Sequence, residues 1–164
     1  MNKITFSKAQ KSELLIIHDL AEQIWRAYYP GIITNNQIEY MLKMMYSIES
    51  LEEQFEKNHQ FYIAYENEKP IGFASVSTTD GKDWFLHKFY ILPDKHGKGI
   101  GSKFLQFLEK ECKPETLELT VNRQNFKSIN FYFKNGFKIV KVQDFDIGEG
   151  FQMNDFLMRK VCSG

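Results

Sequence analysis

The sequence predicts an α/β fold in which a mixed, largely antiparallel twisted sheet is flanked by helices. Three features of the order of the expected elements support this fold class. A first strand is followed by helices, three consecutive strands then form a meander, and two further helices alternate with the remaining strands. This order is typical of an α/β sandwich with helices on its faces. The chain has 164 residues, enough to bury one core, so we expect a single domain over residues 1–164.

The N-terminal part of the chain is predicted to be mainly helical. Apolar residues recur at helical spacing between residues 10 and 28, and Pro30 and Gly31 interrupt that pattern. Thr34 or Asn35 is suited to cap the helix that follows. We therefore expect a strand over residues 4–6 and then three helices, over residues 10–28, over a segment that carries residues 38–46, and over residues 48–57.

Strands are predicted to dominate from residue 60 onward. Residues 60–65 and 71–77 are rich in aromatic and β-branched types, and the turn between them predicts a hairpin. Further on, the sequence predicts a strand over 85–92, a helix over 102–113, a strand over 116–121, a helix that Asn125 is suited to cap and Gly136 to end, a strand over 137–142 and, after a loop with Gly148 and Gly150, a last strand near 156–161.

The most informative stretch is the glycine turn that joins the 85–92 strand to the helix after it. Glycines occupy positions 97, 99 and 101, and Lys95, Lys98 and Lys103 add positive charge nearby. A strand, a glycine turn and a helix N-terminus together point free N–H groups at one place, which favours a phosphate group. The spacing fits neither the P-loop pattern nor the dinucleotide-binding pattern.

Two motifs resemble those of the GNAT family, the Gcn-related N-acetyltransferases. The segment His96-Gly-Lys-Gly99-Ile-Gly101 resembles the family's R/Q-x-x-G-x-G/A pyrophosphate loop, with His96 in place of Arg or Gln. About 25 residues later, the segment from Asn125 to Phe137 resembles the family's N-x-x-A-x-x-x-Y-x-x-x-G-F element, with Ser128 in place of Ala. The element order matches the family layout over nearly the whole chain, and the chain looks similar to the bacterial branch that contains polyamine N-acetyltransferases.

The resemblance implies that the acetyl group of acetyl-CoA passes to a primary amine by direct attack in a ternary complex, with no metal. Tyr132 would protonate the leaving thiolate, and the N–H groups of Ile91 and Leu92 would serve the oxyanion. The residues expected to contact acetyl-CoA are Ile91, Leu92, Pro93, His96, Gly97, Lys98, Gly99, Ile100, Gly101, Ser102, Lys103, Asn125, Tyr132 and Lys134.

The base that accepts the amine proton is less well defined by the sequence. His87 lies in the central strand, and an ordinary histidine pKa near 6.5 suits proton acceptance. Regular alternation would place residues 87, 89 and 91 on one face of the sheet and residues 88, 90 and 92 on the other. Glu22 and His18 on the first helix are alternatives, and so is a chain of water molecules.

The acceptor is expected to contact aromatic residues near the end of the first helix, namely Trp25, Tyr28 and Tyr29. A polyamine is the leading hypothesis, because Glu39, Glu49, Glu52, Glu53 and Glu56 would attract a polycation, although these residues would equally form a solvated helix face. Protein, peptide or antibiotic-like amines stay open. So do a non-catalytic acetyl-CoA sensor and a nucleotide-binding regulator, although a sensor has no need of the general acid Tyr132.

Composition sets further expectations. The formal net charge is zero, which gives no electrostatic case for nucleic-acid binding. There is no run of 18 apolar residues and no apolar signal segment at Met1, so we expect neither a membrane partner nor export. Cys112 and Cys162 lack metal-ligand spacing and suit a reducing cytoplasm. Exposed aromatic strands near the C-terminus would suit a homodimer.

Overall fold

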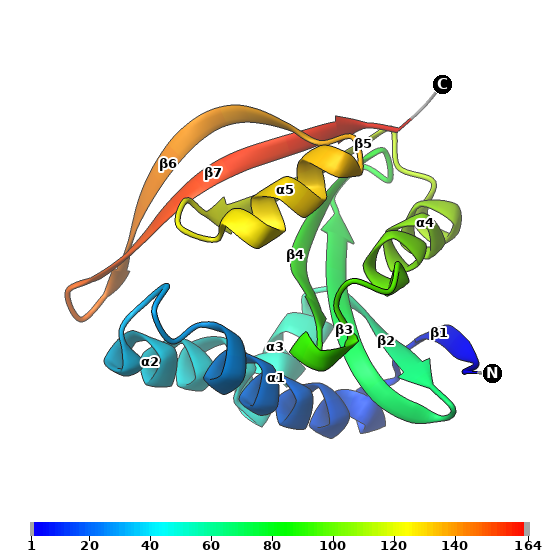
Figure 1. Ribbon diagram of the computed structural model, residues 1–164, viewed down its shortest axis with the longest axis horizontal. Helices are drawn as coiled ribbons and strands as arrows, with labels where there is room; N and C mark the ends of the chain where they lie inside the picture. The colour runs from blue at the N-terminus through cyan, green and yellow to red at the C-terminus, as the bar shows by residue number, and fades with distance from the viewer. Residues whose placement is uncertain (1, 163–164) are drawn as a thin grey trace.

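The computed structural model describes residues 2–162 and shows one sheet of seven strands in the order β1-β2-β3-β4-β5-β7-β6 (Figure 1). Every neighbouring pair is antiparallel except β4 and β5, which confirms the predicted mixed, largely antiparallel sheet. The strands are β1 (Ile4–Lys8), β2 (Gln60–Glu66), β3 (Lys69–Thr78), β4 (Asp83–Ile91), β5 (Thr116–Asn122), β6 (Lys138–Gly148) and β7 (Phe151–Val161). The helices are α1 (Leu14–Tyr28), α2 (Asn35–Tyr46), α3 (Ile48–Glu56), α4 (Ile100–Cys112) and α5 (Phe126–Lys134), with short 3₁₀ turns at Lys11–Glu13 and Pro93–Lys95.

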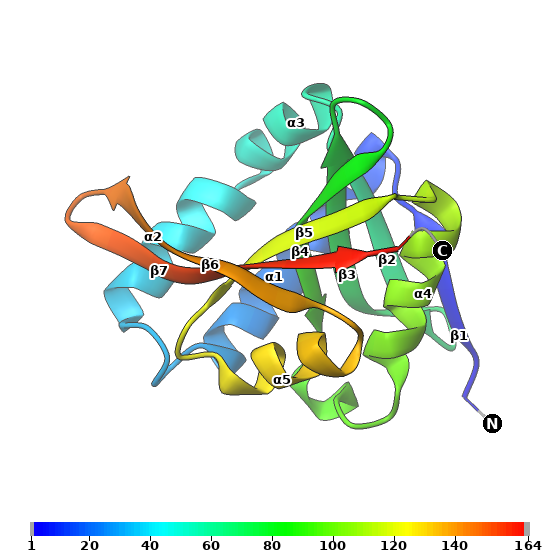
Figure 2. The same ribbon diagram turned by 90° about the horizontal axis from the view of Figure 1, so that it is seen from above.

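Helices cover both faces of the sheet (Figures 1 and 2). On one face, α1, α2 and α3 bury a core that includes Ile17, Ile24 and Leu51 against β2 and β3. On the other face, α4 and α5 bury a second core that includes Phe104 and Leu105. The apolar face that the sequence predicts for α1 is therefore the face that packs on the sheet. Among the described residues, no helix is long and apolar enough to cross a membrane.

The two parallel strands at the middle of the sheet separate soon after they meet. Strands β4 and β5 pair only where Asp83, Trp84 and Phe85 face Thr116, Leu117 and Glu118. Parallel strands need a long crossover connection, which α4 supplies here. Beyond the paired segment the two strands diverge, and residues of both line the cavity described below. The separation of β4 from β5 within the sheet therefore leaves the space in which this cavity forms.

A β-bulge at His87 changes the predicted orientation of the β4 side chains. Lys88 faces Ser75 on β3, but Leu86 faces the next residue, so His87 is an extra residue with no partner across the strand pair. His87 stacks on His59 with ring centroids 4.1 Å apart, whereas Phe89 packs on Phe104 of α4 at 5.3 Å. The prediction that residues 87, 89 and 91 share one face is therefore wrong.

Most predicted boundaries agree with the structure, with three corrections. Helix α1 begins at Leu14 after a 3₁₀ turn, and α4 begins at Ile100, two residues earlier than predicted. The last two strands are much longer than predicted and form one hairpin. The expected loop around Gly148 is the tight turn of that hairpin, because Gly148, Glu149 and Gly150 all have positive φ angles.

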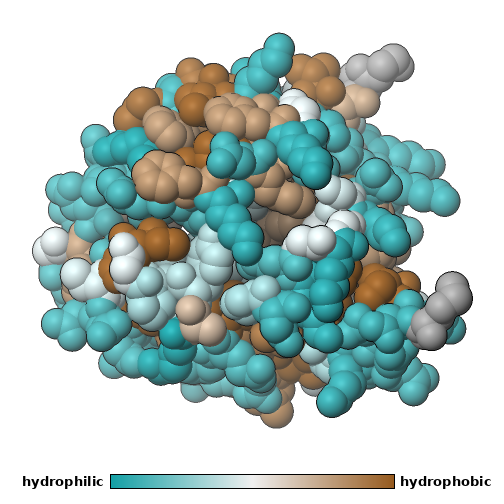
Figure 3. All heavy atoms as spheres, viewed as in Figure 1, coloured by the Kyte–Doolittle hydropathy of each residue, from teal (hydrophilic) through white to brown (hydrophobic). Residues whose placement is uncertain are grey.

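Strand β6 lies at one of the two edges of the sheet and carries exposed apolar side chains. Ile139, Val140, Val142 and Phe145 are between 39% and 58% exposed. Figure 3 shows apolar residues gathered over the part of this view where α5 and β6 lie. An edge strand with unpaired backbone groups is a template for pairing with another chain. The homodimer stays a prediction, and β6 is the strand through which two copies would pair.

Candidate active site

The turn between β4 and α4 presents a helix N-terminus to solvent. Gly97 and Gly99 have φ angles of +76° and +78°, and a Cβ atom at either position would meet nothing within 4 Å. Glycine is therefore needed there for the left-handed backbone and not for space. Gly99 caps α4, so the first N–H groups of this helix, which have no acceptor within the helix, point out of the turn. Such a turn can bind an anion.

Gly101 has a different role from the two glycines before it. A Cβ atom on Gly101 would lie only 2.9 Å from Cε1 of Phe131. The absence of a side chain therefore lets α4 approach α5 closely. This contact brings the anion-binding turn next to the helix that carries Tyr132.

His96 is held by two contacts and brings a lysine to the turn. Its Nε2 atom lies 2.8 Å from the carbonyl oxygen of Ile91, and its Nδ1 atom lies 2.8 Å from Nζ of Lys127. With Nε2–H donating to the carbonyl, Nδ1 accepts from the ammonium group, which requires a neutral ring. Burial and the Lys127 charge lower the pKa of His96, in agreement with that state. Lys127, which the motif did not indicate, is thus a cation of α5 beside the turn.

The turn opens into a cavity that we call the glycine-loop cleft. It is lined by Tyr28, Phe89, Ile91, Lys95, His96, Gly97, Gly99, Ile100, Gly101, Ser102, Lys127, Ser128, Phe131, Tyr132 and Lys134. Most of the residues expected to contact the cofactor are therefore brought together here. The exceptions are Leu92, Pro93, Lys98, Lys103 and Asn125, which lie outside this lining.

The backbone at the end of β4 corrects one expected role. The Leu92 N–H donates to the Ile71 carbonyl oxygen at 2.8 Å, so it is not available for an oxyanion. Facing residues of an antiparallel pair alternate between hydrogen-bonded and non-hydrogen-bonded positions. Ile91, which faces Gly72, is therefore at a non-hydrogen-bonded position, and its N–H points away from β3 toward the separated strands. Of the two expected donors, only Ile91 has the orientation for this role.

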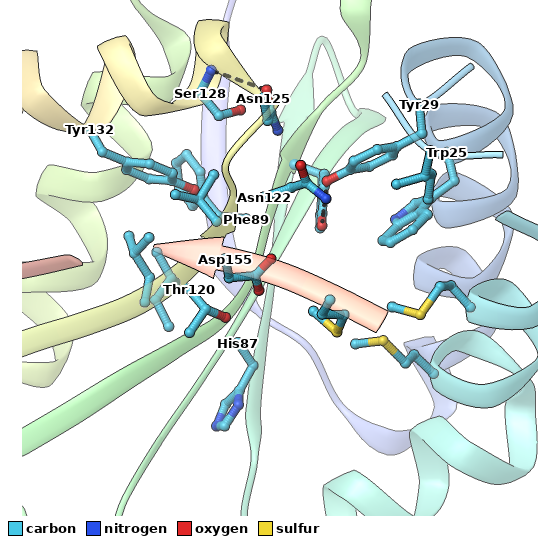
Figure 4. A pocket seen from close by; sticks show the side chains of 18 of the residues that line it. Trp25, Tyr29, His87, Phe89, Thr120, Asn122, Asn125, Ser128, Tyr132 and Asp155 are labelled. Atoms are coloured by element: carbon cyan, nitrogen blue, oxygen red, sulfur yellow. Dashed lines mark hydrogen bonds between the residues drawn. The ribbon is translucent and has the colours of Figure 1, made fainter. Parts of the chain in front are cut away.

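A second cavity, the aromatic pocket, lies where β4 and β5 have separated (Figure 4). It is lined by Trp25, Tyr29, Ile33, Gln37, Met41, Met45, Leu86, His87, Phe89, Tyr90, Leu119, Thr120, Val121, Asn122, Asn125, Ser128, Tyr132, Met153 and Asp155. Trp25 and Tyr29, which were predicted to contact the acceptor, stack at 4.2 Å on one side of it. Tyr28 instead lines the glycine-loop cleft, where its hydroxyl donates to Oδ1 of Asn125 at 2.5 Å.

Asn125 also has the structural role that the sequence predicts. Its side chain accepts a hydrogen bond from the Ser128 N–H at 3.3 Å and so caps α5. At the other end of this helix, Gly136 has a φ angle of +95°, as expected of a glycine that ends a helix. These two residues fix the position of Tyr132 on α5.

Tyr132 stands where the two cavities adjoin. It lines both of them, together with Phe89 and Ser128. Its ring is held by Phe131 and Phe137, each with ring centroids 5.4 Å away. Burial raises the pKa of Tyr132 well above the ordinary tyrosine value, so the hydroxyl keeps its proton at neutral pH. A fixed, protonated hydroxyl between two cavities is suited to proton donation.

Asp155 of β7 is the one carboxylate among the described residues that line the aromatic pocket. It is 1% exposed, and neither carboxylate oxygen has a hydrogen-bond partner in the described part of the chain. Burial raises the pKa of Asp155 to about 6, and the Thr120 hydroxyl and the Arg123 guanidinium only partly offset that rise. Sequence analysis missed it, although it occupies an inward position of an alternating strand in which Asn154 is exposed.

The three residues considered as bases differ in their surroundings. His87 lines the aromatic pocket, but burial lowers its pKa to about 3, with help from His59 and Lys88, and Ser77 Oγ lies 2.6 Å from its Nε2. That pKa is far from the ordinary value on which its expected role rested. His18 contacts the Tyr46 carbonyl oxygen at 2.6 Å, and Glu22 pairs with Arg26 at 2.8 Å. Neither His18 nor Glu22 lines either cavity.

Comparison with known proteins agrees with this geometry. The model of the acetyltransferase (GNAT) family matches residues 17–137. A spermidine N(1)-acetyltransferase of Thermoplasma acidophilum is 30% identical over 96% of this chain and 96% of its own. The crystal structure of a PaiA N-acetyltransferase from the same organism, in complex with coenzyme A, has a TM-score of 0.81 at 28% identity and covers 98% of this chain and 99% of that chain. The peptidyl-lysine N-acetyltransferase YiaC of Escherichia coli is 32% identical over 51% of this chain and 53% of its own.

Proposed function

Because the chain belongs to the acetyltransferase (GNAT) family and is an acetyl-CoA-dependent N-acetyltransferase, we propose that its acceptor is a polyamine, acetylated by direct attack in a ternary complex. The observation that carries this proposal is the junction of the two cavities at Tyr132. One cavity has an anion-binding turn for the cofactor, and the other has a buried carboxylate for an amine. Their common boundary is where the acetyl group and the nitrogen would meet.

The glycine-loop cleft is suited to the charged part of acetyl-CoA. The N-terminus of α4 would bind the pyrophosphate, and Lys127 would add a positive charge. The thioester would then lie beside Ile91, whose N–H would donate to the oxyanion of the tetrahedral intermediate. Tyr132 would donate its hydroxyl proton to the sulfur as the carbon–sulfur bond breaks.

The choice of a polyamine is supported by the similarity to a spermidine N(1)-acetyltransferase over 96% of both chains. The acidic helix residues give less support than the sequence indicated. Glu39 pairs with Arg26, Glu53 with Lys57 and Glu56 with Lys11, so three of the five carboxylates are already compensated. The attraction for an amine is therefore assigned to the aromatic pocket and not to the outer face of these helices.

A peptide lysine is the second candidate acceptor. The support for it is the similarity to a peptidyl-lysine N-acetyltransferase, which covers about half of each chain. A lysine side chain would present the same primary amine to the aromatic pocket, with methylene groups against its apolar lining.

The acceptor is tested by following the release of free CoA thiol with a panel of amines. The panel holds spermidine, spermine, diamines, amino acids, lysine peptides and aminoglycosides, each with acetyl-CoA. We expect spermidine and spermine to give the highest kcat/KM. A higher kcat/KM for lysine peptides would replace the polyamine with the second candidate.

Gly99 provides a test of the cofactor cradle. An L residue in the left-handed conformation costs about 1–2 kcal/mol, so Gly99→Ala should destabilise the protein and distort the turn. We expect the Kd of acetyl-CoA, measured by calorimetry, to rise about tenfold, since 1.4 kcal/mol corresponds to that factor. Gly81→Ala is the matched control, because Gly81 also has a φ angle of +78° and open space around it but lies outside both cavities. An equal rise in Kd for both variants would mean that the turn does not bind the cofactor.

A further inference from the structure

Asp155 is buried with little compensation for its charge, because the Thr120 hydroxyl and the Arg123 guanidinium only partly offset the effect of burial. Its side chain is 1% exposed, and both carboxylate oxygens lack a hydrogen-bond partner among the described residues. Buried charges in proteins are normally paired, because an unpaired one is costly. Figure 4 shows the carboxylate lying in the aromatic pocket between Tyr132 on one side and Trp25 and Tyr29 on the other. A buried carboxylate that lacks a counter-charge and lies in a cavity indicates that the cavity binds a cationic ligand.

Resting on the proposed acetyl transfer, we propose that the Asp155 carboxylate binds the attacking nitrogen of the acceptor and takes a proton from it. The position of Asp155 supports both the binding of the nitrogen and the acceptance of its proton. It lines the same pocket as Tyr132, so a nitrogen bound to it lies on the acceptor side of the cavity junction. Lysine and arginine are absent from the described lining of this pocket, so the acceptor supplies the missing positive charge.

The titratable groups described around Asp155 neither neutralise its carboxylate nor offer a second negative charge for the amine. Arg123 contacts the backbone carbonyl of Asp155 at 3.4 Å, but its guanidinium pairs with Asp144 at 2.9 Å. Across the pocket, burial keeps His87 neutral at physiological pH. Tyr29 and Tyr90, whose hydroxyls lie 3.2 Å apart, have pKa values raised by burial and are neutral too.

The proton balance of the reaction can be closed with Asp155 and Tyr132. The acceptor enters as an ammonium ion and passes one proton to the Asp155 carboxylate, which leaves a neutral amine. Its lone pair forms the carbon–nitrogen bond, and the carbon–sulfur bond then breaks. The thiolate takes the Tyr132 proton, and the second nitrogen proton restores the tyrosine. Asp155 returns its proton to solvent when the product leaves. Desolvation favours the first step, because it lowers the pKa of an amine and raises that of a carboxylic acid.

A single carboxylate also restricts the acceptor. One buried negative charge can compensate one buried ammonium, and a second ammonium in the same pocket would be left unpaired. The apolar lining, which includes Met41, Met45 and Met153, suits the methylene segment next to the nitrogen. We therefore expect reaction at a terminal primary amine, with the remaining charges of a polyamine outside the pocket.

The test compares wild-type protein with Asp155→Asn, which keeps the shape of the side chain and removes its charge. Asp146→Asn, an exposed change on the same hairpin, is the control. For the amine that the wild type uses best, we expect kcat/KM to fall at least about 100-fold in Asp155→Asn and to stay within about twofold in the control. The Kd of acetyl-CoA should be unchanged in both. The wild-type kcat/KM should fall below about pH 6, and this acidic limb should be absent from the residual activity of Asp155→Asn.

The outcomes separate this inference from the acceptor proposal. If the wild type uses lysine peptides and not polyamines, the acceptor proposal fails, and the same comparison with lysine peptides still tests Asp155. If no amine releases thiol, calorimetry of spermidine binding to the protein–CoA complex replaces the rate, and equal or absent binding in wild type and Asp155→Asn overturns the inference. An Asp155→Asn protein that keeps its kcat/KM within about threefold and retains the acidic limb also overturns it.

Discussion

Replacing Tyr132 with phenylalanine is expected to lower kcat by about 100-fold or more and to leave the Kd of acetyl-CoA within about twofold, since general acid catalysis contributes roughly that factor. The ring packs edge-on against Phe131 and Phe137, so the variant keeps the packing and loses only the hydroxyl. Because the hydroxyl acts on the leaving sulfur, its removal affects the transition state and not the bound cofactor. Steady-state kinetics and calorimetric binding measure the two effects separately.

Tyr62→Phe is the control for this change. Tyr62 is buried at 3% exposure, and it lines neither cavity. Its variant should keep wild-type turnover, which shows that the loss of a buried tyrosine hydroxyl alone does not impair the enzyme. Wild-type turnover in Tyr132→Phe would remove this residue from the mechanism.

Replacing Lys88 with methionine is expected to stabilise the protein by on the order of 3 kcal/mol at pH 7. Lys88 is 3% exposed, and burial lowers its pKa from the ordinary 10.5 to about 8. The ammonium nitrogen lies 5.0 Å from the ring centroid of Tyr46, which offsets only part of the cost. Below pH 8 the folded protein must bury this charge, and methionine fills a similar volume without one.

The pH dependence of unfolding tests whether the buried charge of Lys88 is the cause of this stability difference. Between pH 8 and 10.5 the unfolded chain binds more protons at this residue than the folded chain does, so wild-type stability should gain from Lys88 as the pH rises through this range. Chemical denaturation of Lys88→Met should lack that gain. Lys69→Met, on the exposed part of β3, is the control and should leave the stability at pH 7 unchanged. A Lys88→Met protein less stable than wild type would mean that the buried ammonium is compensated.

The parts of the site that depend on local chemistry were predictable from the sequence. The glycine turn needs left-handed backbone at Gly97 and Gly99, and glycine is the residue that adopts it without strain. Thr34 was one of two predicted caps for α2 and Asn125 was the predicted cap of α5, and each accepts a backbone hydrogen bond from the residue three positions later. These features involve neighbours along the chain, so spacing alone identifies them.

The parts that depend on distant contacts were not predictable in the same way. A single inserted residue in β4 turns His87 toward His59, and no local pattern marks that bulge. Leu92 loses its expected role because its N–H is used by β3. Asp155 is a polar residue at an inward position, but only the separation of β4 from β5 shows that the position faces a cavity.

If the acetyl group passes directly to the acceptor, acetyl-CoA and the polyamine must occupy the adjoining cavities at the same time. Initial rates of CoA release, measured over a grid of acetyl-CoA and spermidine concentrations, test it. A ternary complex predicts double-reciprocal lines that intersect. Parallel lines, which indicate an acetylated enzyme intermediate, or CoA release that does not depend on spermidine, would exclude direct transfer in a ternary complex.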